Sequence, residues 1–357
     1  MNFKPSLRDV LPSPTHDAAR TALAARPEAL TGTPWYIRAF SGFGAWFASL
    51  FLMAFLSLAV VVGEESVAIL LGLLITGGAV VLRRVNRSDF LNQFILASGL
   101  AGQGLFLGGV AFAVKSAEMT ALTVFLFQAL LVVLYPDVVQ RFLSTLFSGG
   151  GLLVFLRLAA PSVMADLAMV GFAVSIHALF LQQGRLQSRP WGRLVTPLAF
   201  GLVIVFLGDL VVHTWFTPLY RELSDRGDGG LPLGVLTLGL AAVTLYTAWR
   251  VLEETGTDTR GLAGITVLAA LGLTAVLTLY TPGIIAALGL LLLGFHRRSV
   301  LLLGLAMLFV LVFGAHYYYD IELTLLAKSL ALLGSGLLLL GLRLFILRRF
   351  PAAEEVR

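Results

Sequence analysis

Uninterrupted apolar segments, each about as long as a bilayer is thick, recur along most of this 357-residue sequence. A helix needs about 17 to 25 such residues to cross the hydrocarbon core of a membrane. The chain is 58% hydrophobic and only 13% charged, whereas soluble domains keep about a quarter of their residues charged. A membrane barrel would instead alternate polar and apolar residues in short strands. The runs therefore predict an all-α fold, a polytopic membrane helix bundle.

Twelve runs of this kind can be counted, and each predicts one transmembrane helix. They cover residues 43–62, 66–82, 90–114, 119–135, 139–157, 162–182, 194–214, 231–250, 263–280, 282–296, 299–317 and 323–347. The fifth run contains three consecutive glycines at 149–151 and is expected to be short and broken, and the tenth is also brief. Residues 1–42 contain five prolines and predict a polar cytoplasmic arm. Residues 348–357 predict a short cytoplasmic tail.

The basic residues predict the orientation of the bundle, because cytoplasmic loops of membrane proteins are enriched in Lys and Arg. With the N-terminus in the cytoplasm, twenty of the 25 basic residues fall in segments on that side. The other five are Lys115, Arg157, Arg221, Arg226 and Lys328. An even number of crossings then places both termini in the cytoplasm.

Six ionisable residues lie within the predicted helices: Arg157, Asp166, His177, Asp209, His213 and Lys328. A charge at mid-membrane costs about 2.5 to 3.5 kcal/mol, so each is expected to have a partner. The predicted topology places all but His177 in the outer third of the bilayer. These five residues predict an outward-facing polar cluster, which could serve as a pocket, a proton relay or a substrate site. Asp209 and His213 share a helix face, so the carboxylate could accept a hydrogen bond from the imidazole.

The segment "HYYYDIELTLLAKS" at 316–329 also permits a purely structural interpretation. Lys328 is close enough to the surface for its ammonium to reach the headgroups. Asp320 could cap the last helix, with Glu322 favoured by the positive end of the helix dipole. An aromatic belt at the outer interface would then be formed by Tyr317, Tyr318 and Tyr319.

No sequence motif points to a reaction. The absence of cysteine excludes disulfides, thiolate metal sites and cysteine nucleophiles. HExxH, GxSxG and Walker A motifs are missing, and the glycine runs have no strand before them. The basic residues form no aromatic-interleaved patch, so nucleic acid is not an expected partner despite the net charge of +5. We expect no catalytic residue, metal or cofactor, with a metal site at His213, Asp209 and His177 or His316 as an alternative.

Two stretches resemble a known family. They are "PWYIRAFSGFGAWFASLFL" at 34–52 and "YYYDIELTLLAKSLALLGSGLLLLGLR" at 317–343, and they are similar to the bacterial polytopic family catalogued as domain of unknown function 4401. The resemblance implies a location in the inner membrane of a Gram-negative bacterium and supplies no catalytic residues. It also implies an association with a smaller membrane-anchored protein named for a GDYxxLxY motif, which this sequence lacks.

Three functions are compatible with these features. The first, favoured because no reaction motif is present, is a non-catalytic envelope component or scaffold acting with a small membrane-anchored partner. The second is a transporter of a small solute or lipid-linked group, with the fifth helix and the ninth and tenth helices beside the pathway. The third is a membrane enzyme at the outer leaflet, in which Asp209 and His213 together would act as the general base. The sequence leaves the oligomeric state undetermined.

Overall fold

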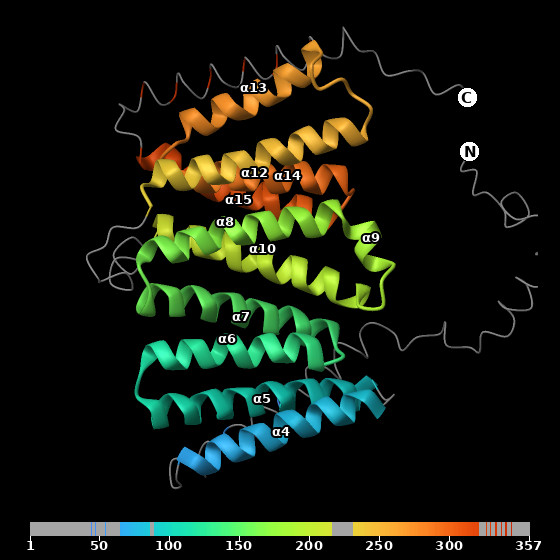
Figure 1. Ribbon diagram of the computed structural model, residues 1–357, viewed down its shortest axis with the longest axis vertical. Helices are drawn as coiled ribbons and strands as arrows, with labels where there is room; N and C mark the ends of the chain where they lie inside the picture. The colour runs from blue at the N-terminus through green and yellow to red at the C-terminus, as the bar shows by residue number, and fades with distance from the viewer. Residues whose placement is uncertain are drawn as a thin grey trace, which may run out of the picture. The chain divides into compact units, whose positions relative to one another are not determined.

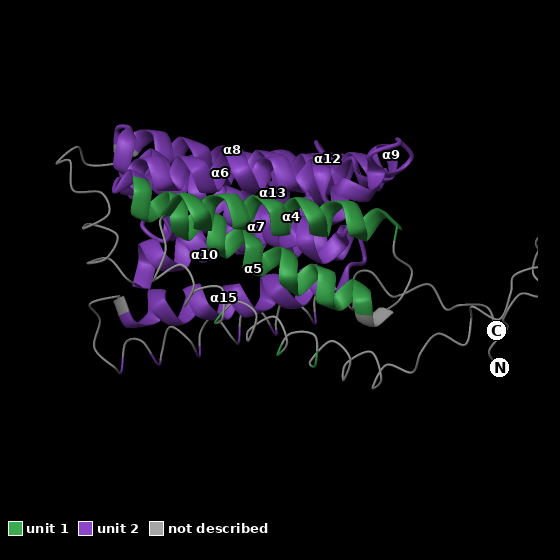
Figure 2. Ribbon diagram, turned by 90° about the horizontal axis from the view of Figure 1, so that it is seen from below, with its two compact units in different colours: residues 1–113 green, residues 114–357 purple. Residues whose placement is uncertain are grey.

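The computed structural model describes residues 65–85, 89–215 and 231–320, together with isolated helical positions between 44 and 54 and between 326 and 344. The chain divides into two compact units, Met1–Ala113 and Val114–Arg357, which Figure 2 shows in different colours. The regular structure of the described ranges is α-helical. The predicted all-helical fold is therefore confirmed.

The helices follow the apolar runs of the sequence (Figure 1). In chain order they are α4 (Glu65–Val85), α5 (Asp89–Val114), α6 (Ala117–Leu134), α7 (Val138–Ala159), α8 (Ser162–Leu181), α9 (Gln183–Gln187), α10 (Gly192–Trp215), α12 (Leu233–Glu254), α13 (Leu262–Leu277), α14 (Pro282–His296) and α15 (Val300–Asp320). All but the short α9 correspond to a predicted run. The predicted helices at 43–62 and 323–347, like the arm and the tail, lie outside the described residues, so twelve spans and cytoplasmic termini stay predictions.

Eight of the described helices are long and apolar enough to cross a membrane. The helices α13 and α14 are apolar but shorter, with 16 and 15 residues. Hydrocarbon leaves no water to satisfy backbone groups, so helices of this length and composition are the form in which an apolar chain can cross it. The protein is therefore a polytopic membrane protein.

The fifth predicted helix is not broken, contrary to the expectation from its three glycines. The helix α7 continues through them for 22 residues. A Cβ added at Gly151 would lie 2.9 Å from the backbone nitrogen of Phe125 on α6, and one at Gly149 would lie 3.1 Å from Val205 on α10. Glycine at these positions lets two neighbouring helices approach α7 closely. In an apolar environment the backbone keeps its hydrogen bonds, so the helix stays intact.

The short helix α14 lies at the centre of the second unit. It packs mainly against α12 and α15 and also contacts α8, α10 and α13. Nine of its 15 residues are buried. Proline at position 282 starts the helix where a missing N–H costs nothing. Because α14 extends only about 22 Å, its burial among other helices shelters it from the lipid that it is too short to cross.

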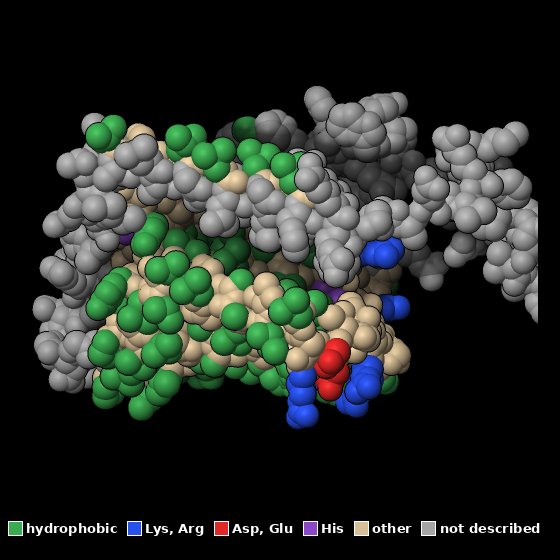
Figure 3. Space-filling view, turned by 90° about the horizontal axis from the view of Figure 1, so that it is seen from above, with side chains coloured by type: hydrophobic (Ala, Val, Ile, Leu, Met, Phe, Trp, Pro, Cys, Tyr) green, Lys and Arg blue, Asp and Glu red, His purple; other side chains and the backbone are tan. Residues whose placement is uncertain are grey.

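Arginines gather at one end of the second unit, which we call the arginine-rich end. The helices α8, α12 and α14 end there, since Arg297 donates a hydrogen bond to the carbonyl oxygen of Leu181 and His296 lies 2.9 Å from Glu254. In Figure 3 the charged side chains of the described residues on the visible face collect at one end, and apolar side chains are spread over the rest of the described surface. We call the other end, where α7 and α10 terminate, the opposite end.

Candidate functional site

The predicted polar cluster contains a buried ion pair at the opposite end. Arg157, in the last turn of α7, places its Nη2 atom 2.7 Å from both carboxylate oxygens of Asp209 on α10. The two side chains are 4% and 10% exposed. A charge-assisted contact of this kind offsets part of the cost of removing both charges from water. The pair therefore joins α7 to α10 through groups that would otherwise be costly to bury.

Asp166 joins two further helices at the same end. It lies near the start of α8, is 3% exposed, and accepts a hydrogen bond of 2.8 Å from the backbone N–H of Leu231. Leu231 lies two residues before α12, just ahead of the N-cap Pro232, so its backbone N–H has no partner inside the helix. The carboxylate thus holds the beginning of α12 against α8.

The other predicted members of the cluster have different environments. His213 lies one turn beyond Asp209, in the last turn of α10. The Asp209 carboxylate is engaged by Arg157, and the expected hydrogen bond from His213 stays a prediction. A guanidinium forms a stronger, charge-assisted bond than a neutral imidazole. Lys328 and Glu322 lie outside the described residues.

The predicted aromatic belt lies in the last turn of α15. The hydroxyl of Tyr317 donates a hydrogen bond of 3.2 Å to the carbonyl oxygen of Leu277, where α13 ends. The rings of Tyr318 and Tyr319 meet edge to face at 5.5 Å, and Tyr319 is 76% exposed. Asp320 is the last residue of α15. Tyr317 therefore links α15 to α13, and the interfacial role of the three tyrosines stays a prediction.

A second polar site, which the sequence did not predict, lies near the arginine-rich end. There a cavity of about 690 Å³ opens between α8 and α12. The side of α8 and the following α9 contributes Val174, His177, Ala178, Leu181, Gln182 and Arg185. The side of α12 contributes Ala242, Val243, Tyr246, Arg250 and Glu254. Apolar and charged residues thus share one cavity.

His177 forms part of the cavity wall and is only 4% exposed. Its Nδ1 atom lies 2.6 Å from the hydroxyl oxygen of Thr247, which itself donates to the carbonyl oxygen of Val243 at 2.9 Å. The threonine hydroxyl therefore accepts from Nδ1–H, and a neutral imidazole keeps its lone pair on Nε2. The ring thus keeps Nε2 as a hydrogen-bond acceptor, and a Cβ built at Gly289 of α14 would lie 3.3 Å from this atom.

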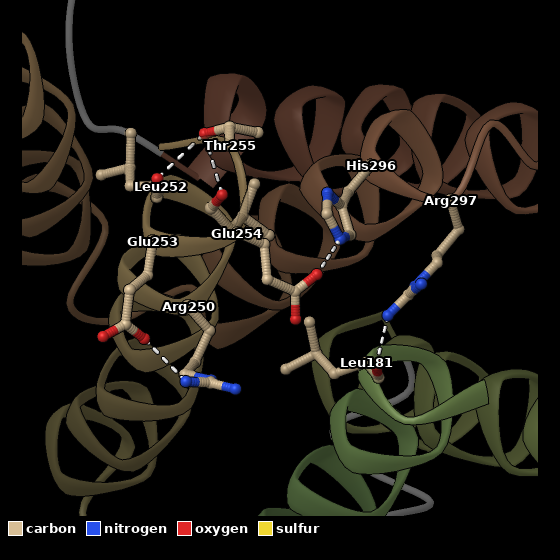
Figure 4. Close-up of polar contacts among 9 residues, drawn as sticks. Leu181, Arg250, Leu252, Glu253, Glu254, Thr255, His296 and Arg297 are labelled. Atoms are coloured by element: carbon tan, nitrogen blue, oxygen red, sulfur yellow. Dashed lines mark hydrogen bonds and ion pairs between the residues drawn. The ribbon is translucent and has the colours of Figure 1, made fainter. Parts of the chain in front are cut away.

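Polar contacts connect the helix ends around the cavity (Figure 4). Arg250 lies 2.6 Å from Glu253 on the same helix, and Glu254 pairs with His296 of α14.

In the sequence, Arg185 and Arg250 were interpreted only as indicators of topology. His177, Leu181 and Arg185 follow one another at intervals of four residues, the spacing of one helix face. This spacing is the signal that could have suggested a polar site there. Among the residues with described positions, no three His, Asp or Glu side chains gather closely enough to hold a metal ion.

Comparison with known proteins identifies the family of the chain but no individual relative. No curated protein and no solved structure matches the chain. The family model described as Domain of unknown function (DUF4401) matches residues 34–349, nearly the whole sequence. The two stretches that resemble this family in the sequence lie within the match. The chain therefore belongs to the DUF4401 family.

Proposed function

We propose that the protein is a non-catalytic scaffold of the bacterial inner membrane that acts with a small membrane-anchored partner. The observation that supports this role is the buried contact between Arg157 and Asp209. A proton relay or a general base needs a carboxylate that can exchange its proton partner during turnover. Here Asp209 is held by a guanidinium and Asp166 by a backbone N–H. Both carboxylates are used to connect helices.

The proposed orientation places the arginine-rich end in the cytoplasm, following the distribution of basic residues. The opposite end, with the ion pair and the tyrosines of α15, then faces the periplasm. A partner anchored in the same membrane would meet a bundle in which the carboxylates of Asp209 and Asp166 already have partners. That condition suits a rigid binding platform, since little rearrangement is needed before association.

The scaffold role is tested by removing the charges while keeping the packing. In the double variant Arg157→Met/Asp209→Leu, the ion pair is replaced by apolar groups of similar size. We expect the GDYxxLxY partner, co-expressed and crosslinked in native membranes, to co-purify with this variant as it does with the unaltered chain. Loss of the partner from a double variant that is still folded and inserted would contradict the proposal.

Transport is the second candidate, favoured by the cavity between α8 and α12. Proteoliposomes that contain the full chain and a pH-sensitive dye separate the two roles. A scaffold predicts the same proton flux with the unaltered chain, with Asp209→Asn and with empty vesicles under an imposed membrane potential. Flux that requires the unaltered chain and disappears in Asp209→Asn would instead establish a proton-coupled pathway.

A further inference from the structure

The cavity between α8 and α12 has the extent of a site for one lipid. Its lining on α12 runs from Ala242 to Glu254, a helical rise of about 18 Å. The hydrocarbon core is roughly 30 Å thick, so one leaflet accounts for about half of that thickness. The lining therefore extends slightly farther than the depth of one leaflet. The volume of about 690 Å³ lies within the range of small-molecule sites. The cavity therefore extends inward from the arginine-rich end to about the middle of the bundle.

The lining changes from charged to apolar along this depth. Arg185 lies within α9 and Arg250 lies about one turn before the end of α12, so both line the cavity near the arginine-rich end. Farther inside, the walls are formed by Val174, Ala242 and Val243. Basic pockets between membrane helices are suited to phosphate headgroups, and apolar walls are suited to hydrocarbon. The order of the residues matches the order of groups in an anionic lipid.

The two arginines are available to an anion. Within the described part of the chain, Arg185 has no ion-pair partner. Arg250 contacts Glu253, but these side chains are 39% and 49% exposed, and exposed pairs of this kind contribute little to stability. Glu254 is engaged by His296. A phosphate could therefore recruit both guanidinium groups at little cost.

A buried histidine adds a polar group to the lining of the cavity. Nε2 of His177 has no hydrogen-bond partner among the residues with described positions, although the side chain is only 4% exposed. Its neighbour Thr247 lies three residues before Arg250 on α12, or about 4.5 Å along the helix axis. An acceptor nitrogen at this depth is suited to a hydroxyl close to the phosphate, or to a water held beside it.

We propose that this cavity binds a single anionic glycerophospholipid from the surrounding leaflet. The phosphate contacts Arg185 and Arg250, and a headgroup hydroxyl or its bound water donates to Nε2 of His177. One acyl chain lies against the apolar walls of α8 and α12. Such a lipid would fill the gap between these two helices, and it would do so independently of the scaffold role.

Native mass spectrometry of the purified full chain in detergent tests this site. The chain is titrated with dioleoyl phosphatidylglycerol and, in parallel, with dioleoyl phosphatidylcholine. We expect one phosphatidylglycerol to be retained preferentially. The variant Arg185→Gln/Arg250→Gln should bind it roughly ten-fold more weakly, because charge-assisted hydrogen bonds to the phosphate are lost. The variant Ala242→Phe should also reduce occupancy, since it fills the cavity without changing the charge.

The matched control is Arg189→Gln/Arg260→Gln, which removes the same net charge from residues that do not line the cavity. Its affinity for phosphatidylglycerol should equal that of the unaltered chain. Equal weakening in this control would show general attraction to a basic surface and overturn the proposal. Unchanged binding in Arg185→Gln/Arg250→Gln would overturn it as well. Binding of glycerol 3-phosphate as tight as that of the lipid would show that the ligand comes from the water phase.

Discussion

Replacing one member of the Arg157–Asp209 pair should destabilise the protein far more than replacing both. The pair is 4% and 10% exposed, with contacts of 2.7 Å, so solvent screens it little. At an effective dielectric constant of about 20, opposite charges roughly 4 Å apart attract by about 4 kcal/mol. Removal of one partner leaves a buried charge without that compensation and typically costs 3 to 5 kcal/mol.

The magnitude is measured with a double-mutant cycle. Arg157→Met and Asp209→Leu should each lower the free energy of unfolding by about 3 to 5 kcal/mol, whereas the double variant should lose no more than about 2 kcal/mol, because apolar replacements of a buried pair are often neutral. The coupling energy is then at least about 4 kcal/mol. Reversible unfolding in mixed micelles, followed by circular dichroism, provides these values.

The exposed pair of Arg250 and Glu253 is the matched control for this cycle. Its side chains are 39% and 49% exposed, so the cycle Arg250→Met with Glu253→Leu should give a coupling energy below about 1 kcal/mol. Additive losses in the Arg157 and Asp209 cycle, with a coupling energy as small as in the control, would refute the reasoning. They would mean that solvent or another group compensates each charge separately.

Two further substitutions test the packing of the second unit, both measured by the same unfolding assay. Gly283→Ala should cost about 1 to 3 kcal/mol, because the added Cβ would lie 2.4 Å from the fully buried ring of Phe313. The control Gly272→Ala, where a Cβ meets nothing within 4 Å, should change stability by less than about 1 kcal/mol. Equal costs would contradict the close packing of Gly283 against Phe313. Thr247→Val should cost about 1 to 3 kcal/mol, since it leaves the Nδ1–H of buried His177 without its acceptor, and a neutral result would mean that the ring finds another partner.

The helices could be predicted from the sequence because the bilayer sets their length and charged residues limit them. The tenth run was predicted at 282–296, and α14 has the same bounds. Pro282 favours a helix start at that point, and Arg297 directly follows the apolar run. The error at the glycines of α7 arose because glycine has two roles. It weakens an isolated helix, but in a membrane bundle it also permits close packing.

The sites were less predictable, because they depend on which helices are neighbours. The cost of a buried charge indicated that Arg157 and Asp209 need partners, but only the parallel packing of α7 and α10 identifies them as partners of each other. The cavity was missed for the same reason. Its two arginines, Arg185 and Arg250, come from segments that are distant in the sequence and adjacent in the fold.

Accessibility of single cysteines tests the membrane arrangement most directly, since the chain contains no cysteine of its own. Ser188 and Thr257 lie in links at the arginine-rich end, and Tyr280 lies in the link between α13 and α14 at the opposite end. In intact cells, a membrane-impermeant maleimide should label Tyr280→Cys but should reach Ser188→Cys and Thr257→Cys only after the membrane is opened. Labelling of Tyr280→Cys and Ser188→Cys from the same side would contradict a bundle that crosses the bilayer between its two ends.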